Sequence, residues 1–158
     1  MGIFDKLFGG KTETESASTG EGAAEPEISP EQLHMACAAL LLEVAEADYK
    51  DDPKETQAIL RALESELGLK RATVTALLDQ AKAETEGATD LFPYTHLINQ
   101  RCTREQKCAM LTAMWRVAFA DGDLDKYEEH LIRRTTELLR LEHSDFIRAK
   151  QAGRPKQN

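Results

Sequence analysis

The feature that most constrains this chain is a degenerate internal repeat. The segment 41–48, which reads LLEVAEAD, recurs 73 residues later as MWRVAFAD at 114–121. Each copy runs from an apolar helical stretch into an acidic loop and then re-enters a helical pattern. Two related helix–loop–helix units predict a single helical domain with pseudo-twofold internal symmetry.

Apolar residues recur at helical spacing along most of the chain, and the alternating pattern of strands is absent. Ser29 followed by Pro30 is a helix start, and Thr103 with Gln106 forms a capping box. The sequence therefore predicts an all-α fold, a single bundle of about six to seven helices.

The segment from Thr103 to Asp121 is apolar on almost every side. A helix of that kind belongs in the centre of a bundle, so we expect it to be the most buried element. Its expected central residues are Met114, Trp115 and Ala118. In the helices that follow, Tyr127 falls among the apolar positions of one, and the last short helix carries Phe146 and Ile147.

Composition divides the chain into four parts. Residues 1–10 form a short amphipathic segment, and residues 11–28 are an acidic linker of Thr, Glu, Ser, Ala and Gly with almost nothing to bury. Residues 29–152 are the expected domain, and 153–158 are a tail.

The amphipathic segment carries four apolar residues on one side, Ile3, Phe4, Leu7 and Phe8. Two interpretations are open. The segment folds back onto the domain, or residues 2–8 attach reversibly to a membrane surface or to a groove on a partner protein.

Net charge is −8, which argues against a nucleic-acid-binding protein. The charge is uneven, because residues 1–103 carry −10 and residues 104–158 carry +2. No run is long and apolar enough for a membrane span, and the start lacks a secretory signal, so we expect a cytoplasmic protein. Three cysteines without a CxxC pair argue against a disulfide framework.

The acidic loops contain the best candidate for a functional site. Carboxylates at alternate positions can converge on one hard cation through oxygen ligands. The expected ligands of a divalent cation, with Ca, Mg, Mn and Zn all open, are Asp48, Asp52, Glu55, Asp121, Asp123, Asp125 and Glu128.

Two observations weigh against a calcium loop of the EF-hand type. That pattern requires glycine at its sixth position and glutamate at its twelfth. Counted from Asp121, the glycine is at the second position (Gly122) and the twelfth is isoleucine (Ile132). The same acidic residues are also suited to capping the helices that follow, where the macrodipole favours negative charge.

The second copy, WRVAFADGDLDKYEEHLIRR at 115–134, and the closing SDFIRAK at 144–150 resemble the tellurite-resistance TerB family. The similarity covers about residues 30–150. The first copy departs from it, with Tyr49 at the position of Gly122 and Lys50 at that of Asp123. The resemblance implies an all-helical domain with an acidic, metal-binding patch. It also implies a bacterial stress-response role beside membrane-associated or chaperone-like complexes, in the cytoplasm or peripheral to the inner membrane.

No nucleophile, paired histidines or phosphate loop accompanies the carboxylates, so we expect no enzymatic activity. The leading hypothesis is an accessory stress-response module whose acidic loops bind a divalent cation. The alternative is an adaptor or co-chaperone-type domain that docks a basic protein partner without metal.

Overall fold

The computed structural model describes residues 29–47, 52–86, 90–120, 122 and 124–155. These residues form seven α-helices, and no strand is present among them. The all-α prediction is confirmed. The helices are α2 (Pro30–Glu46), α3 (Pro53–Leu67), α4 (Arg71–Thr85), α5 (Phe92–Arg101), α6 (Arg104–Ala118), α7 (Lys126–Leu138) and α8 (His143–Gly153). The last of these extends one residue beyond the expected end of the domain.

The predicted helix starts are made by local side-chain caps. Ser29 Oγ accepts from the backbone N–H of Gln32 at 3.1 Å, and the Gln32 side chain accepts from the Ser29 N–H at 2.8 Å. Thr103 and Gln106 form the same reciprocal box at the start of α6, with distances of 3.1 and 2.8 Å. These bonds satisfy amide groups that have no partner within the helix.

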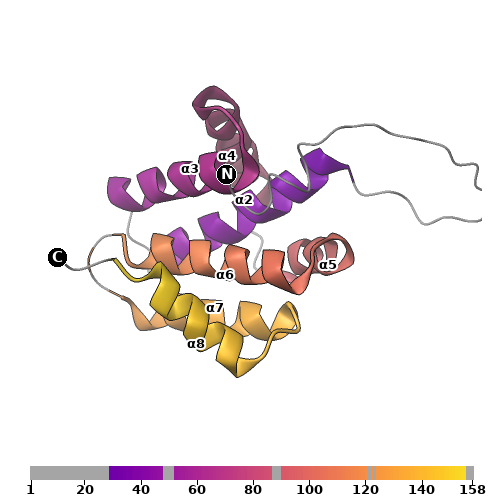
Figure 1. Ribbon diagram of the computed structural model, residues 1–158. Helices are drawn as coiled ribbons and strands as arrows, with labels where there is room; N and C mark the ends of the chain where they lie inside the picture. Colours follow the sequence, from indigo (N-terminus) through magenta and orange to yellow (C-terminus); the bar gives the residue numbers. More distant parts are fainter. Residues whose placement is uncertain (1–28, 48–51, 87–89, 121, 123, 156–158) are drawn as a thin grey trace, which may run out of the picture.

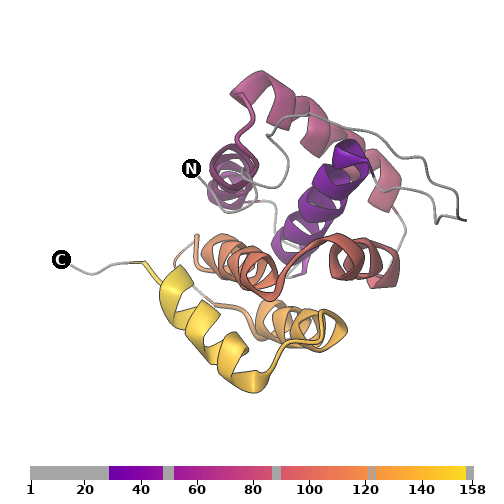
Figure 2. The same ribbon diagram turned by 45° about the vertical axis from the view of Figure 1, so that its right-hand side comes forward.

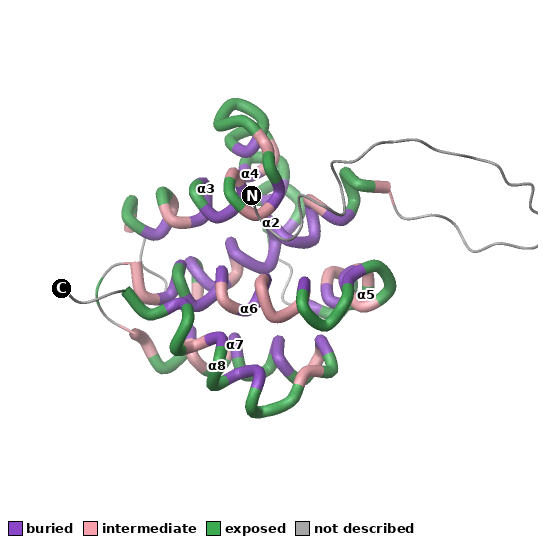
Figure 3. Tube along the Cα trace, viewed as in Figure 1, coloured by how far each residue is buried: buried purple, intermediate pink, exposed green. Residues whose placement is uncertain are grey.

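Helix α2 lies at the centre and packs against α3, α4, α5, α6 and α7. Figures 1 and 2 show α3 and α4 on one side of α2 and α6, and α7 and α8 on the other. The buried residues, purple in Figure 3, line the inward faces of these helices.

The expectation that the helix ending near Asp121 is the most buried element is wrong. Eleven of the seventeen residues of α2 are buried, against eight of the fifteen in α6. The reason is that residues 35–45 of α2 hold a single polar residue, Glu43, so every face of that stretch can be covered. The expected centre of α6 is confirmed, because Met114, Trp115 and Ala118 are fully buried.

One expectation for α7 is corrected, because Tyr127, placed among the apolar positions of this helix, is 56 % exposed. In α8, Phe146 is buried and Ile147 is 39 % exposed. Tyr127 stands in the first turn of α7 with the Lys126 ammonium 5.5 Å from its ring centroid. A side chain in the first turn of a helix has fewer neighbours than a side chain on the same face in the middle of the helix.

Trp115 holds α8 against α6. Its ring meets Phe146 of α8 edge to face at 5.3 Å, and Phe119 stacks on it at 5.6 Å. The Lys150 ammonium of α8 lies 5.2 Å from the ring centroid. Aromatic pairs in these geometries add about 0.5–1.5 kcal/mol to the gain from burial.

Close packing of the same pair of helices depends on Gly153. A Cβ atom at this position would lie 2.6 Å from the Cβ of Trp115 and 2.9 Å from the carbonyl oxygen of Thr112. Neither atom is the end of a flexible side chain, so only glycine lets the last turn of α8 approach α6 this closely.

Replacing Trp115 by alanine is expected to lower the free energy of unfolding by about 3–5 kcal/mol, because a large, fully buried aromatic site is emptied. Trp115→Phe keeps most of the apolar contact and should cost clearly less. Urea denaturation measures both, and a midpoint for Trp115→Ala close to that of the wild type would contradict this packing.

Gly153→Ala is expected to destabilise the protein by about 1–3 kcal/mol, because overpacking forces backbone shifts. Helix propensity alone predicts the opposite sign. The control is Ala152→Gly at the exposed neighbouring residue, which should cost only about 0.5–1 kcal/mol through propensity. A Gly153→Ala protein that melts above the wild type would show that α8 is not held at this distance.

Candidate functional site

The two acidic loops connect equivalent helices of the repeat. The first joins α2 to α3, whose N-cap is Asp52, and the second joins α6 to α7, whose N-cap is Asp125. The two caps are separated by the repeat offset of 73 residues. Figures 1 and 2 show the C-terminal ends of α2 and α6 and the first turns of α3 and α7 on the same side of the bundle.

Both capping aspartates bind backbone amides. Asp52 Oδ1 accepts from the N–H of Lys54 at 2.9 Å, and Asp125 Oδ1 accepts from the N–H of Tyr127 at 2.7 Å. A carboxylate in this place is also favoured by the positive end of the helix macrodipole. Each aspartate therefore stabilises a helix start whether or not a cation is present, and both remain partly exposed.

The glutamates of the first turns are buried. Glu55 is 1 % exposed and Glu128 is fully buried, although the sequence placed both among surface ligands. Glu128 Oε1 accepts from the Asp125 N–H at 3.1 Å, which completes a capping box. Any contribution of these two glutamates to an ion site would come from beneath the loop rather than from its rim.

Four of the seven predicted ligands thus have a described position: Asp52, Glu55, Asp125 and Glu128. Asp48, Asp121 and Asp123 lie outside the described residues. Within the part of the chain that the structure describes, no three His, Cys, Asp or Glu side chains are arranged to hold a metal ion. The described carboxylates alone do not make a complete site.

A depression of about 680 Å³ lies between α3 and α6 and adjoins both loops. Pro53, which directly follows the first loop, lines it on one side, and Ala120, which directly precedes the second loop, lines it on the other. The end of the first acidic loop and the start of the second therefore adjoin the same depression.

Three cations line this depression: Lys54, Arg61 and Arg116. Sequence analysis did not connect them with the acidic loops, although the seven-residue spacing of Lys54 and Arg61 places both on one face of α3. Arg116 lies 3.9 Å from Glu66. The depression between α3 and α6 is therefore positively charged, in contrast to the acidic loops that it adjoins.

The cysteines have raised pKa values and offer no activated thiolate. Burial raises the pKa of Cys102 to about 11, and burial also raises that of Cys37. The pKa of Cys108 is raised by burial and by Asp145, which outweigh Arg104 and Arg148. A nucleophilic cysteine needs the opposite shift.

Comparison with known proteins identifies the class. The fold is an all-helical domain built from a repeated helix–acidic loop–helix unit, and the sequence model of the tellurite resistance protein TerB matches residues 34–151. The match covers well over half of the chain, so the protein belongs to the TerB family. No curated protein matches the chain.

A solved structure shares the fold. It is the crystal structure of a protein of unknown function, PG1108, from Porphyromonas gingivalis W83, with a TM-score of 0.61 and 20 % sequence identity. The similarity covers 87 % of this chain and 98 % of that one. At this identity the likeness supports the architecture alone.

The capping role of Asp125 predicts a difference between two substitutions. Asp125→Ala should lower the free energy of unfolding by about 1 kcal/mol, whereas Asp125→Asn should be nearly neutral because asparagine caps equally well. Thermal or urea unfolding without added divalent ions measures both. Equal losses in the two variants would show that the charge, and not the hydrogen bond to Tyr127, stabilises this turn.

Proposed function

We propose that this TerB-family protein is a non-enzymatic bacterial stress-response module whose paired acidic loops bind a divalent cation. The observation that supports this most is that α2 and α6 end on the same side of the bundle, where Asp52 and Asp125 cap the helices that follow. Carboxylates 73 residues apart in the sequence would there act on one ion.

The type of ligand limits the choice of ion. All seven candidate ligands are carboxylates, and oxygen ligands suit Ca²⁺, Mg²⁺ and Mn²⁺. Zinc sites usually include cysteine or histidine, and none of the seven candidate ligands is either residue. Among the four ions left open by the sequence, the hard cations are therefore favoured.

Asp52 and Asp125 would have two tasks in such a site. One oxygen of each already accepts a backbone N–H, which fixes the direction of the carboxylate. Asp48, Asp121 and Asp123 would supply the remaining oxygens. Binding would join two helix starts from different halves of the repeat and stabilise the end of the bundle.

The expected partner is another protein, at a membrane-associated complex or in the cytoplasm, and not nucleic acid. None of the helices in the described ranges is both long and apolar enough to cross a membrane. A cation that joins the loops would change the charge of this surface, which provides a physical route from ion concentration to partner binding.

The test is thermal unfolding with Ca²⁺, Mg²⁺, Mn²⁺ and Zn²⁺ added one at a time. A ligand at 100 times its Kd stabilises the native state by about 2.7 kcal/mol. For a domain of this size each kcal/mol raises Tm by about 2–4 °C. We therefore expect a rise of several degrees with at least one hard cation. Asp121→Asn should abolish the rise, and Asp79→Asn on the exposed surface of α4 should keep it.

An unchanged Tm with every ion at millimolar concentration would contradict cation binding. The adaptor hypothesis, in which the acidic loops dock a basic partner, would then take its place. A rise that survives Asp121→Asn but disappears in a variant outside the loops would place the ion elsewhere.

A further inference from the structure

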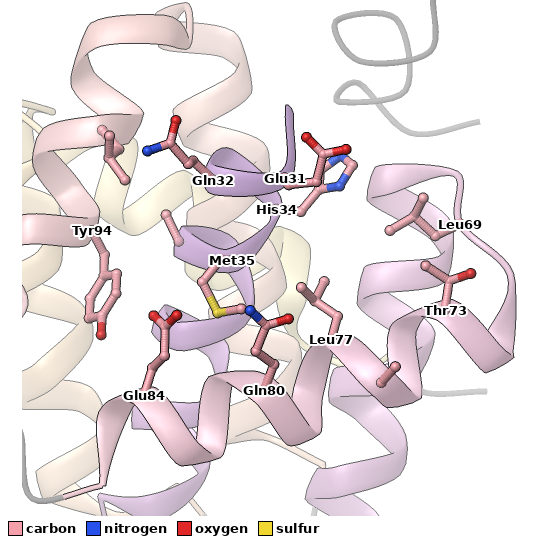
Figure 4. Close-up of a pocket in the computed structure, with 13 residues that line it drawn as sticks. Glu31, Gln32, His34, Met35, Leu69, Thr73, Leu77, Gln80, Glu84 and Tyr94 are labelled. Carbon is pink, nitrogen blue, oxygen red and sulfur yellow. The ribbon is translucent and has the colours of Figure 1, made fainter. Parts of the chain in front are cut away.

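A groove of about 510 Å³ runs between α2, α4 and α5, on a different part of the domain from the acidic loops (Figure 4). Apolar groups line much of it, and Figure 4 shows Met35 and Leu77 pointing into the space between α2 and α4. Its apolar lining residues include Met35 of α2, Leu77 of α4, Tyr94 and Leu97 of α5, and Leu69 of the connection between α3 and α4. Its volume is within the range of pockets that bind ligands.

The edge of this groove is acidic. Figure 4 shows Glu31 toward one end and Glu84 toward the other, and no lysine or arginine is part of the lining. The nearby Glu43 acts on Tyr94 together with Glu84, and burial with these two charges raises the pKa of Tyr94. The groove therefore suits an apolar segment that carries positive charge.

The internal repeat supplies a second groove for comparison. Residues 31, 32, 35 and 36 of the first groove correspond at the 73-residue offset to 104, 105, 108 and 109, which line a depression of about 820 Å³ between α6 and α8. Arg104 replaces Glu31 and Cys108 replaces Met35. Further arginines, Arg116 and Arg148, line this second groove, and its apolar groups are mostly alanines.

The chain enters the domain at the first groove. Ser29 caps α2, and the first turn of α2 supplies Glu31 and Gln32 to the lining. Ser29, to which the preceding residues are joined, therefore lies beside this groove. Those preceding residues include Ile3, Phe4, Leu7 and Phe8, spaced to share one side of a helix.

We propose that residues 2–8 of the same chain occupy the groove between α2, α4 and α5. The apolar side chains of the segment cover Met35, Leu77 and Leu97, in the way that amphipathic helices bind grooves in other proteins. Lys6 brings a positive charge to the acidic edge, and Asp5 beside it offsets that charge, so the fit depends chiefly on apolar contact. The second groove, whose apolar groups are mostly alanines, offers this segment less apolar contact.

The tether between the segment and the groove is long enough to let the segment reach the groove and short enough to keep its local concentration high. Residues 9–28 provide a tether of about twenty residues, for which a flexible chain has a root-mean-square length of about 25 Å. Such a tether gives an effective concentration on the order of millimolar. Even an intrinsic Kd near a millimolar would leave the groove about half occupied, and stronger binding would fill it. Occupancy would be reversible, so a partner with a similar segment could compete for the groove.

The experiment compares amide chemical shifts of the ¹⁵N-labelled full chain with those of a Phe4→Asp/Phe8→Asp variant. We expect changes at the groove, in α4 and at Leu97 of α5, when the apolar contact is lost. The control is Thr12→Asp/Thr14→Asp, which adds the same two charges in the tether and should leave the groove unchanged. Changes limited to residues 1–28, or located on another face, would overturn the proposal.

A reciprocal pair of variants blocks each groove in turn. Ala76 and Ala152 are both exposed, and each lines one of the two grooves. Ala76→Arg should release the segment and shift the amides of Ile3 and Leu7, whereas Ala152→Arg should leave them in place. An effect of Ala152→Arg alone would assign the segment to the second groove and overturn the proposal.

Two further measurements distinguish this intramolecular contact from binding of the segment to a second copy of the chain or to membranes. A contact within one chain does not depend on concentration, so the shifts should be constant from about 1 mM to about 50 µM. Shifts that revert on dilution would show that a second copy supplies the segment. A membrane-binding role would give a different result. The chemical shifts of the groove residues would not respond to Phe4→Asp/Phe8→Asp, and this variant would no longer sediment with anionic vesicles. Either result would overturn the proposal.

Discussion

The fold depends on the need to cover α2 on every side. Between Met35 and Ala45 this helix presents a single polar side chain, so no face of it can be left to water without cost. Five other helices pack against it. Helix α8 is the exception, since it packs chiefly on α6 and completes the second half of the domain. Trp115 and Gly153 determine how closely it can approach.

The position of the acidic loops follows from this arrangement. Helices α2 and α6 pack together and end on the same side of the bundle, so both acidic loops begin on that side. The first turn of each following helix uses its aspartate for a backbone amide and buries its glutamate. Part of the negative charge of the repeat is thereby used for structure.

The repeat also produces two related grooves that have diverged in chemistry. Exchange of Glu31 for Arg104, and of Met35 for Cys108, changes an apolar groove with an acidic edge into one with small side chains and arginines. In the second groove the buried carboxylate of Asp145 accepts from Arg104 at 2.9 and 3.0 Å. Burial raises the pKa of Asp145, but this bond and the N–H of Glu142 outweigh it and hold the pKa below its usual value. Two pseudo-symmetric parts of one backbone thus present grooves of different chemistry.

Local signals in the sequence were enough to determine the helices, their caps, the repeat and the family. Capping boxes such as Thr103 with Gln106, and apolar residues at helical spacing, act over three or four residues, so they can be recognised without the tertiary structure. The tertiary structure decided which helix is central and that Glu55 and Glu128 are buried. It also decided that Lys54, Arg61 and Arg116 line one depression between α3 and α6. These properties depend on which surfaces face each other across the bundle, and a residue's neighbours in sequence do not reveal its neighbours in space.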